Sequence, residues 1–264
     1  PGFFVMMPFR GRLVQGVGWE SSNTPSISMM GKKILAIHSA IMQFAPFDES
    51  DLKLLEYAAE YYLVSKGALV KAVIPDAPKR LGEISPDDLT ASRERIAGFG
   101  PSPLLSGLTG KPALFLYQNK QLMLEEIRNW IGNTSGAENK FLVLEPQINS
   151  IKQTAAYLDE SFPGKVAILH SGLSKGVYWK NWINFALGKK KILVSSRIGI
   201  FAPSRSLRAI FIIDEEMPDF KQYDQNPRYD ARSLALRLGE LGVRPEWISR
   251  YRAGAATPQR LYPG

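Results

Sequence analysis

Short apolar runs alternate with helical patterns through the second half of the chain, and this alternation restricts the fold more than any other feature. The runs cover residues 113–117, 141–144, 166–169, 192–194 and 210–213. Strands that are apolar on both faces and separated by helices are typical of a parallel sheet covered by helices on each side. We therefore expect residues 101–264 to form one α/β lobe whose ligands lie beyond the carboxyl ends of its strands.

The first part of the chain has a different pattern. It contains short β-type runs at 3–7, 13–19 and 34–37 and one helical pattern at 48–67. We expect Gly67 to end that helix. Residues 76–100 are rich in proline and charge and contain one capped helical start, at Ser85. These patterns predict a small β-rich domain over residues 1–75, a linker with a short helix, and then the lobe.

The composition favours a polyanionic partner. The net charge is +8, and residues 101–264 carry 22 Lys and Arg against 14 Asp and Glu. Such an excess attracts phosphates, although a basic surface without a partner is the alternative. The chain has no cysteine and two histidines, so we expect no metal site. Since no apolar run approaches about 20 residues, we expect a cytoplasmic protein without a membrane segment. Because the chain begins at Pro1 and not at methionine, we expect its natural start to lie upstream.

A glycine-rich stretch, LLSGLTGKPALFLY, has the outline of a phosphate-binding loop. The residues that fit or adjoin its cradle are Gly107, Thr109, Gly110 and Lys111. A working loop places a lysine and then a hydroxyl after its second glycine, to hold the phosphates and magnesium. Here Ala113 and Leu114 stand at those two places. We therefore expect no cofactor, with ATP and Mg²⁺ bound only if the altered loop retains affinity.

Two carboxylates, Asp214 and Glu215, follow the last apolar run in the stretch FIIDEE. Acids at the tip of a buried strand can hold a magnesium ion and orient a water molecule for phosphate chemistry. Without the lysine and hydroxyl of the loop, they are either relics of such a site or a solvated turn.

The segment DFKQYDQNPRYDAR, residues 219–232, interleaves aromatic rings with cations. The candidate DNA contacts in it are Phe220, Lys221, Tyr223, Arg228 and Tyr229. Rings stack on unpaired bases while cations meet the backbone, which suits single-stranded nucleic acid. The alternative is an ordinary loop whose rings pack inward. Arg197, which follows two serines at a strand end, is a further candidate phosphate contact.

Taken in order, these motifs resemble the PriA family of bacterial replication-restart helicases. The stretch SFPGKVAILHSGLS (161–174) is similar to the family's RFPGRVAVLHSGLS, and FIIDEEMPDFKQ (211–222) to its IIVDEEHDSSYKQ. VLEPQINSIKQ (143–153), VSSRIGIFAP (194–203) and VMMPFRGRLVQGVG near the start also match. The resemblance implies a RecA-like, P-loop NTPase-type helicase lobe and an N-terminal domain that recognises the 3′ end of the leading strand.

The resemblance also assigns roles to particular residues. Lys32 corresponds to a residue lining the 3′-end pocket, and Arg10 falls where the family has a pocket glycine. The family's aromatic-rich loop, which senses single-stranded DNA, corresponds to residues 219–232. The implied partners are forked or single-stranded DNA, and primosome proteins or single-strand-binding protein.

Several departures from the family pattern predict a degenerate and truncated member. Met217 and Asp230 replace two histidines, and the loop lysine is missing. The first hypothesis is a module that binds forked or single-stranded DNA without hydrolysing ATP. The second is an ATP-dependent 3′-to-5′ helicase of superfamily 2 whose second lobe is supplied from elsewhere. The third is a scaffold for primosome proteins. Whether the chain is an enzyme stays open at this point.

Overall fold

A four-stranded parallel sheet forms the centre of the lobe in the computed structural model, which describes residues 1–22, 35–77, 99–101, 117, 119–136 and 138–241. Its strands are β4 (Lys140–Leu144), β5 (Val166–Leu169), β6 (Ile192–Ser195) and β7 (Leu207–Ile212), in the spatial order β5-β6-β4-β7. All three pairings are parallel. The predicted α/β class is therefore confirmed. The run at 113–117 lies outside the described residues, apart from Tyr117.

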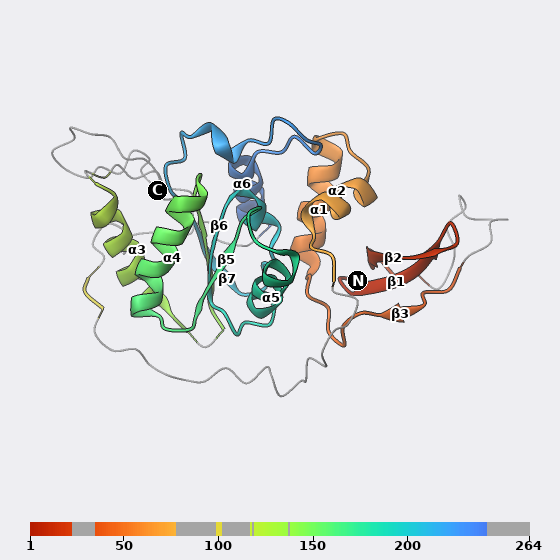
Figure 1. Cartoon of the computed structure of the whole chain (residues 1–264), viewed down its shortest axis with the longest axis horizontal. Helices are drawn as coiled ribbons and strands as arrows, with labels where there is room; N and C mark the ends of the chain where they lie inside the picture. The colour runs from red at the N-terminus through yellow and green to blue at the C-terminus, as the bar shows by residue number, and fades with distance from the viewer. Residues whose placement is uncertain (23–34, 78–98, 102–116, 118, 137, 242–264) are drawn as a thin grey trace.

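Helices cover both faces of this sheet (Figure 1). Along β4, Phe141 and Val143 face α3 (Lys120–Thr134) and α4 (Ile148–Ser161), because successive side chains of a strand point to opposite faces. Leu142 and Leu144 face the other layer, which contains α5 (Lys175–Ala186) and α6 (Ala231–Glu240). The carboxyl ends of β4, β6 and β7 thus meet at one edge.

The N-terminal part is a three-stranded antiparallel sheet followed by two helices. Its strands are β1 (Phe4–Phe9), β2 (Arg12–Val17) and β3 (Ser39–Ala40), in the order β2-β1-β3. The strand expected at 34–37 is not found over the described residues of that run, and β3 begins at Ser39. Leu35 and Ile37 are more than half exposed, so burial of their side chains does not stabilise a strand at these residues.

The prediction of one helix reaching Gly67 was wrong. Helix α1 covers Glu49–Tyr61 and a second helix, α2, covers Lys66–Val73. Between them Leu63 adopts a positive φ of 52°, a conformation that a helix interior does not allow. Ser65 then caps α2 by accepting a hydrogen bond from the Ala68 N–H at 3.2 Å. Gly67 consequently lies in the first turn of α2.

The two parts share one apolar core. Phe4 of β1 contacts Trp179 and Trp182 of α5, with ring centroids 6.1 and 5.4 Å apart. Phe47 lies 5.6 Å from Trp182 and 5.5 Å from Phe4. Aromatic rings of this size dominate the energetics of the contacts that they enter. The N-terminal part is therefore packed directly against the lobe.

A buried polar contact reinforces this junction. The Asp51 carboxylate of α1 accepts a hydrogen bond from the Ser204 N–H at 2.8 Å, and both residues are buried. Burial raises the pKa of Asp51 to about 6. Lys140 of β4 is also buried, which lowers its pKa to about 8, and its ammonium donates to the carbonyl oxygen of Pro203 at 3.1 Å. None of the helices in the described ranges combines the length and apolarity that a bilayer crossing requires.

Candidate nucleic-acid interface

The segment after β7, residues 219–232, forms the aromatic–basic loop at the carboxyl edge of the sheet. It begins with a short 3-10 helix, Pro218–Phe220, and returns to start α6. The Gln222 N–H donates to the Tyr229 carbonyl oxygen at 2.8 Å, and this bond joins the two ends of the segment 222–229. Residues 223–228 therefore project from a fixed base.

The three aromatic rings of the loop have different environments. Phe220 is 0% exposed and Tyr229 is 4% exposed, with the Tyr229 ring 4.9 Å from that of Phe201. These two rings belong to the core, so the expectation that they stack on bases is corrected by their burial: neither has a face open to a base. Tyr223 is 59% exposed. Of the three, Tyr223 is the ring that can accept a stacked base.

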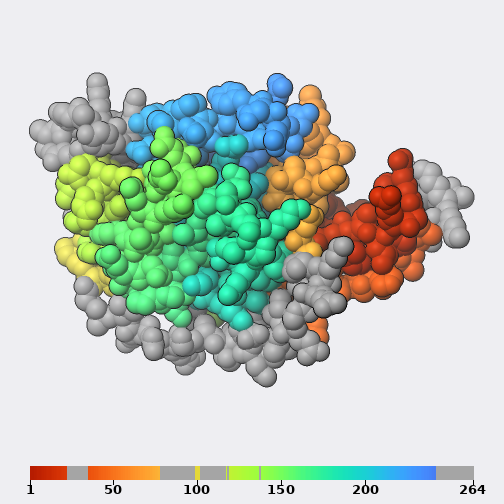
Figure 2. All heavy atoms as spheres, in the orientation of Figure 1, coloured from red at the N-terminus to blue at the C-terminus, as the bar shows by residue number. Residues whose placement is uncertain are grey.

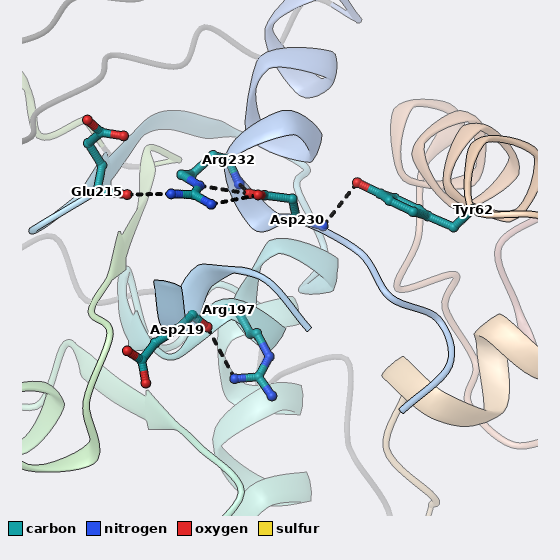
Figure 3. A network of polar contacts seen from close by, with 6 residues as sticks. All are labelled: Tyr62, Arg197, Glu215, Asp219, Asp230 and Arg232. Atoms are coloured by element: carbon teal, nitrogen blue, oxygen red, sulfur yellow. Dashed lines mark hydrogen bonds and ion pairs between the residues drawn. The ribbon is translucent and has the colours of Figure 1, made fainter. Parts of the chain in front are cut away.

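Arg232 fixes the end of the loop (Figure 3). Its Nε and Nη2 donate to the two carboxylate oxygens of Asp230 at 2.9 and 2.7 Å, and its Nη1 donates to the carbonyl oxygen of Glu215 at 2.7 Å. Partial burial alone would raise the pKa of Asp230, but the Arg232 contacts outweigh it, so this pKa lies below its usual value. Asp230 also caps α6, and its N–H donates to the Tyr62 hydroxyl at 3.0 Å. The replacement of the family's histidine by Asp230 thus creates an internal ion pair.

Arg197 fixes the beginning of the loop. Its Nε donates to Gln222 Oε1 at 2.7 Å, and its Nη2 donates to the same oxygen. Its Nη1 donates to the Asp219 carbonyl oxygen at 3.2 Å (Figure 3). These bonds give Arg197 a role in positioning the loop that the sequence did not suggest. Its contact with a phosphate stays a prediction.

Helix α1 adds rings that the sequence analysis missed. Tyr57 and Tyr61 stack with centroids 5.4 Å apart, Tyr61 is 61% exposed, and Tyr62 lies edge-on to Tyr61 at 5.0 Å. The Lys221 ammonium lies 5.4 Å from the Tyr62 ring centroid, which brings this helix next to the loop. The signal in the sequence was YAAEYY, whose tyrosine spacing places rings on one side of a helix.

A buried ion pair lies at the same edge of the sheet. The Lys120 ammonium, in the first turn of α3, lies 2.9 and 3.0 Å from the two carboxylate oxygens of Glu145, which follows β4. Glu145 is 0% exposed and also accepts a hydrogen bond from the Thr154 hydroxyl. Burial raises the pKa of Glu145, Lys120 and Thr154 oppose this shift, and the charge of Asp214 adds to it. Sequence analysis missed this pair, because Lys120 and Glu145 are 25 residues apart.

The structure describes only part of the predicted nucleotide site. Asp214 is half-buried beyond β7 with a positive φ of 55°, and Glu215 follows it with its carbonyl oxygen bonded to Arg232. Lys120, a cation at this edge, is already neutralised by Glu145. Within the described ranges, no three His, Asp or Glu side chains gather as a metal site would require. Gly107, Thr109, Gly110 and Lys111 lie outside the described residues.

Two of the remaining predicted contacts, Arg10 and Lys32, belong to the N-terminal part. Arg10 lies in the turn of the β1–β2 hairpin, with a positive φ of 49° and its guanidinium 5.5 Å from the Phe9 ring centroid. Figure 2 shows this hairpin standing out from the body of the molecule. Lys32 lies outside the described residues. In the aromatic–basic loop, Lys221 is half-buried and Arg228 is exposed.

Together these features define an α/β protein with a small antiparallel sheet fused to a parallel-sheet lobe, and with cations and open rings where the two meet. Residues 1–75 match the family model of the PriA 3′ DNA-binding domain. The chain is therefore PriA-like.

Curated relatives named Replication restart protein PriA match further parts of the chain. The Synechocystis protein is 35% identical over 48% of the chain, the Bacillus subtilis protein 30% over 59%, and the Rickettsia felis protein 22% over 90%. The matches cover 15%, 17% and 37% of those three relatives, so the chain spans a minor part of their lengths.

Proposed function

We propose that this chain is a cytoplasmic replication-restart protein that binds forked or single-stranded DNA and does not hydrolyse ATP. The observation that supports binding best is the position of the aromatic–basic loop. Its Lys221 lies 5.4 Å from the ring centroid of Tyr62, at the end of α1, and Tyr223 is exposed two residues further along. Helix α1 belongs to the segment that matches a 3′ DNA-binding domain. Rings that stack on bases, next to cations that meet phosphates, suit an unpaired strand.

The residues at the carboxyl edge of the sheet support the proposal that the protein does not hydrolyse ATP. Phosphoryl transfer depends on a cation that neutralises the charge developing on the phosphates. The described cation nearest to this role, Lys120, is held by the buried carboxylate of Glu145. Ala113 and Leu114 stand at the lysine and hydroxyl places of the loop. Both observations argue against a productive nucleotide site.

Fluorescence anisotropy with a labelled fork tests DNA binding. We expect affinity to fall steeply as salt rises, because each neutralised phosphate releases counterions. Absence of binding at about 50 mM salt would contradict the proposal and favour a scaffold for primosome proteins or single-strand-binding protein. Fork DNA and a single strand of equal length should be compared, because the proposal names both as ligands.

A steady-state ATPase assay with the same fork tests the second half of the proposal. We expect no turnover above the background of the DNA alone. DNA-stimulated turnover that disappears in Asp214→Ala would overturn this expectation. It would support the helicase alternative, which Asp214 and Glu215 beyond β7 favour by their position.

A further inference from the structure

A pocket of about 280 Å³ lies where the N-terminal part meets the lobe. One wall is the C-terminal end of α2 and the residues after it, including Val73, Ile74 and Pro75. The facing wall belongs to the aromatic–basic loop, and Figure 2 shows this loop lying directly against the helices of the N-terminal part. The volume is close to the lower end of the range for small-molecule sites, about 300 to 1,000 Å³.

The two walls differ in chemistry. Val73 and Ile74 are buried and apolar, so they suit the face of a flat ring. The loop wall carries three carboxamides, Gln222, Gln225 and Asn226. A carboxamide presents both a donor and an acceptor, and it can therefore match the polar edge of a heterocycle.

Cationic and phenolic groups complete the lining. Arg197 lines the pocket and is held in place by Gln222 Oε1, which leaves the Gln222 amide N–H groups for a ligand. Tyr178 and Tyr229 also line it, and burial raises the pKa of both hydroxyls, so they stay protonated donors at neutral pH. An apolar wall, amide edges and a fixed cation together match a nucleotide: a base between the walls and a phosphate near the guanidinium.

The surroundings of the pocket indicate where such a nucleotide comes from. Tyr223 and Lys221 flank Gln222 in the chain, and the Tyr223 ring is open to solvent. Because adjacent residues are 3.8 Å apart along the backbone, a strand stacked on Tyr223 passes within a nucleotide or two of the pocket. The opposite wall includes Pro75, which is the last residue of the segment that matches the 3′ DNA-binding domain. These neighbours favour a nucleotide that is part of a DNA strand over a free small molecule.

We infer that this junction pocket holds one unpaired base of a DNA strand that lies along the aromatic–basic loop. The inference rests on the proposed DNA-binding function and specifies where one nucleotide is held. The pocket clamps a strand between the two parts of the molecule, and the carboxamides tolerate different bases because each can donate and accept.

Ala72→Trp tests the inference by filling the pocket from its rim. Ala72 lines the pocket and is exposed, so the larger ring enters the cavity without disturbing the core. The matched control is Ala68→Trp, on the same helix and exposed, one turn earlier and outside the pocket lining. A second variant, Gln225→Ala, removes one amide from an exposed position.

Oligonucleotides with a single 2-aminopurine at successive positions are titrated with each protein, and affinity is measured by anisotropy. We expect one position to change fluorescence on binding to the wild type. Ala72→Trp should abolish that change and lower affinity about 5- to 150-fold, the loss typical of one base contact. Gln225→Ala should weaken binding in the same direction, and Ala68→Trp should behave as the wild type.

The outcomes separate the two proposals. If the wild type binds no DNA, the proposed function and the pocket inference both fail. If the wild type binds but Ala72→Trp and Gln225→Ala bind equally well with an unchanged fluorescence profile, the pocket inference alone is overturned. If Ala68→Trp weakens binding as much as Ala72→Trp, the effect belongs to the surface of α2, and the pocket is again excluded.

Discussion

Replacing Asp51 by alanine should loosen the junction between the N-terminal part and the lobe. Its carboxylate accepts from the Ser204 N–H at 2.8 Å and from the Asp48 N–H at 3.0 Å. Ser204 is 2% exposed, so its N–H would be left buried without this acceptor. An unsatisfied buried donor costs about 1 to 3 kcal/mol. We therefore expect the free energy of unfolding to fall by about that amount at pH 7.

The effect should grow on acidification. Burial raises the pKa of Asp51 from 3.8 to about 6, so the folded state binds the proton more tightly than the unfolded state. The stabilisation from this protonation is complete below pH 3.8 and is lost as pH rises through 6. Between pH 7 and pH 5 the wild type therefore gains about 1 kcal/mol from this group, and the variant does not.

Urea unfolding followed by tryptophan fluorescence at pH 7 and pH 5 measures both effects, since Trp179 and Trp182 lie in the junction. Glu49→Ala is the matched control: Glu49 belongs to the same helical turn, but its side chain is 82% exposed, so its loss should leave the free energy of unfolding nearly unchanged. A difference between wild type and Asp51→Ala that shrinks from pH 7 to pH 5 would refute the reasoning. So would a loss as small as that of the control.

Three further predictions concern the carboxyl edge of the sheet. Tyr223→Ala should lower single-strand affinity by about 1 to 3 kcal/mol in anisotropy titrations with unchanged urea stability, and equal affinity would exclude stacking on this ring. Phe220→Ala should instead lower the free energy of unfolding by about 3 to 5 kcal/mol, because Phe220 is fully buried; a stable variant with weakened DNA binding would show that the ring acts at the surface. Glu145→Ala should destabilise the fold by about 1 to 3 kcal/mol, because it removes the acceptor of the buried Thr154 hydroxyl and the ion-pair partner of Lys120. Calorimetry of that variant that shows no loss in melting temperature would contradict the importance of the pair.

The sequence predicted the lobe well because its strands are buried on both faces. Four apolar runs became β4 to β7, since a continuous apolar run of that length is stable only inside a covered sheet. On α3, Met123, Ile127 and Ile131 lie buried on one face, and their spacing, which repeats with the helix turn, is visible in the sequence.

The parts that sequence could not predict depend on contacts between distant residues. The interleaved rings and cations of residues 219–232 gave no sign that Phe220 and Tyr229 point into the core while Tyr223 points outward. The pairing of Lys120 with Glu145 joins two elements 25 residues apart, and no local pattern records it. The break between α1 and α2 depends on one backbone angle at Leu63, and a leucine carries no turn signal.

The aromatic cluster of Phe4, Phe47, Trp179 and Trp182 has a mechanical consequence. Rings in close contact resist sliding and hinging, so the β1–β2 hairpin and the carboxyl edge keep one relative orientation. If the proposed DNA binding uses both places, this packing would hold the two DNA contacts at a fixed distance and angle to each other.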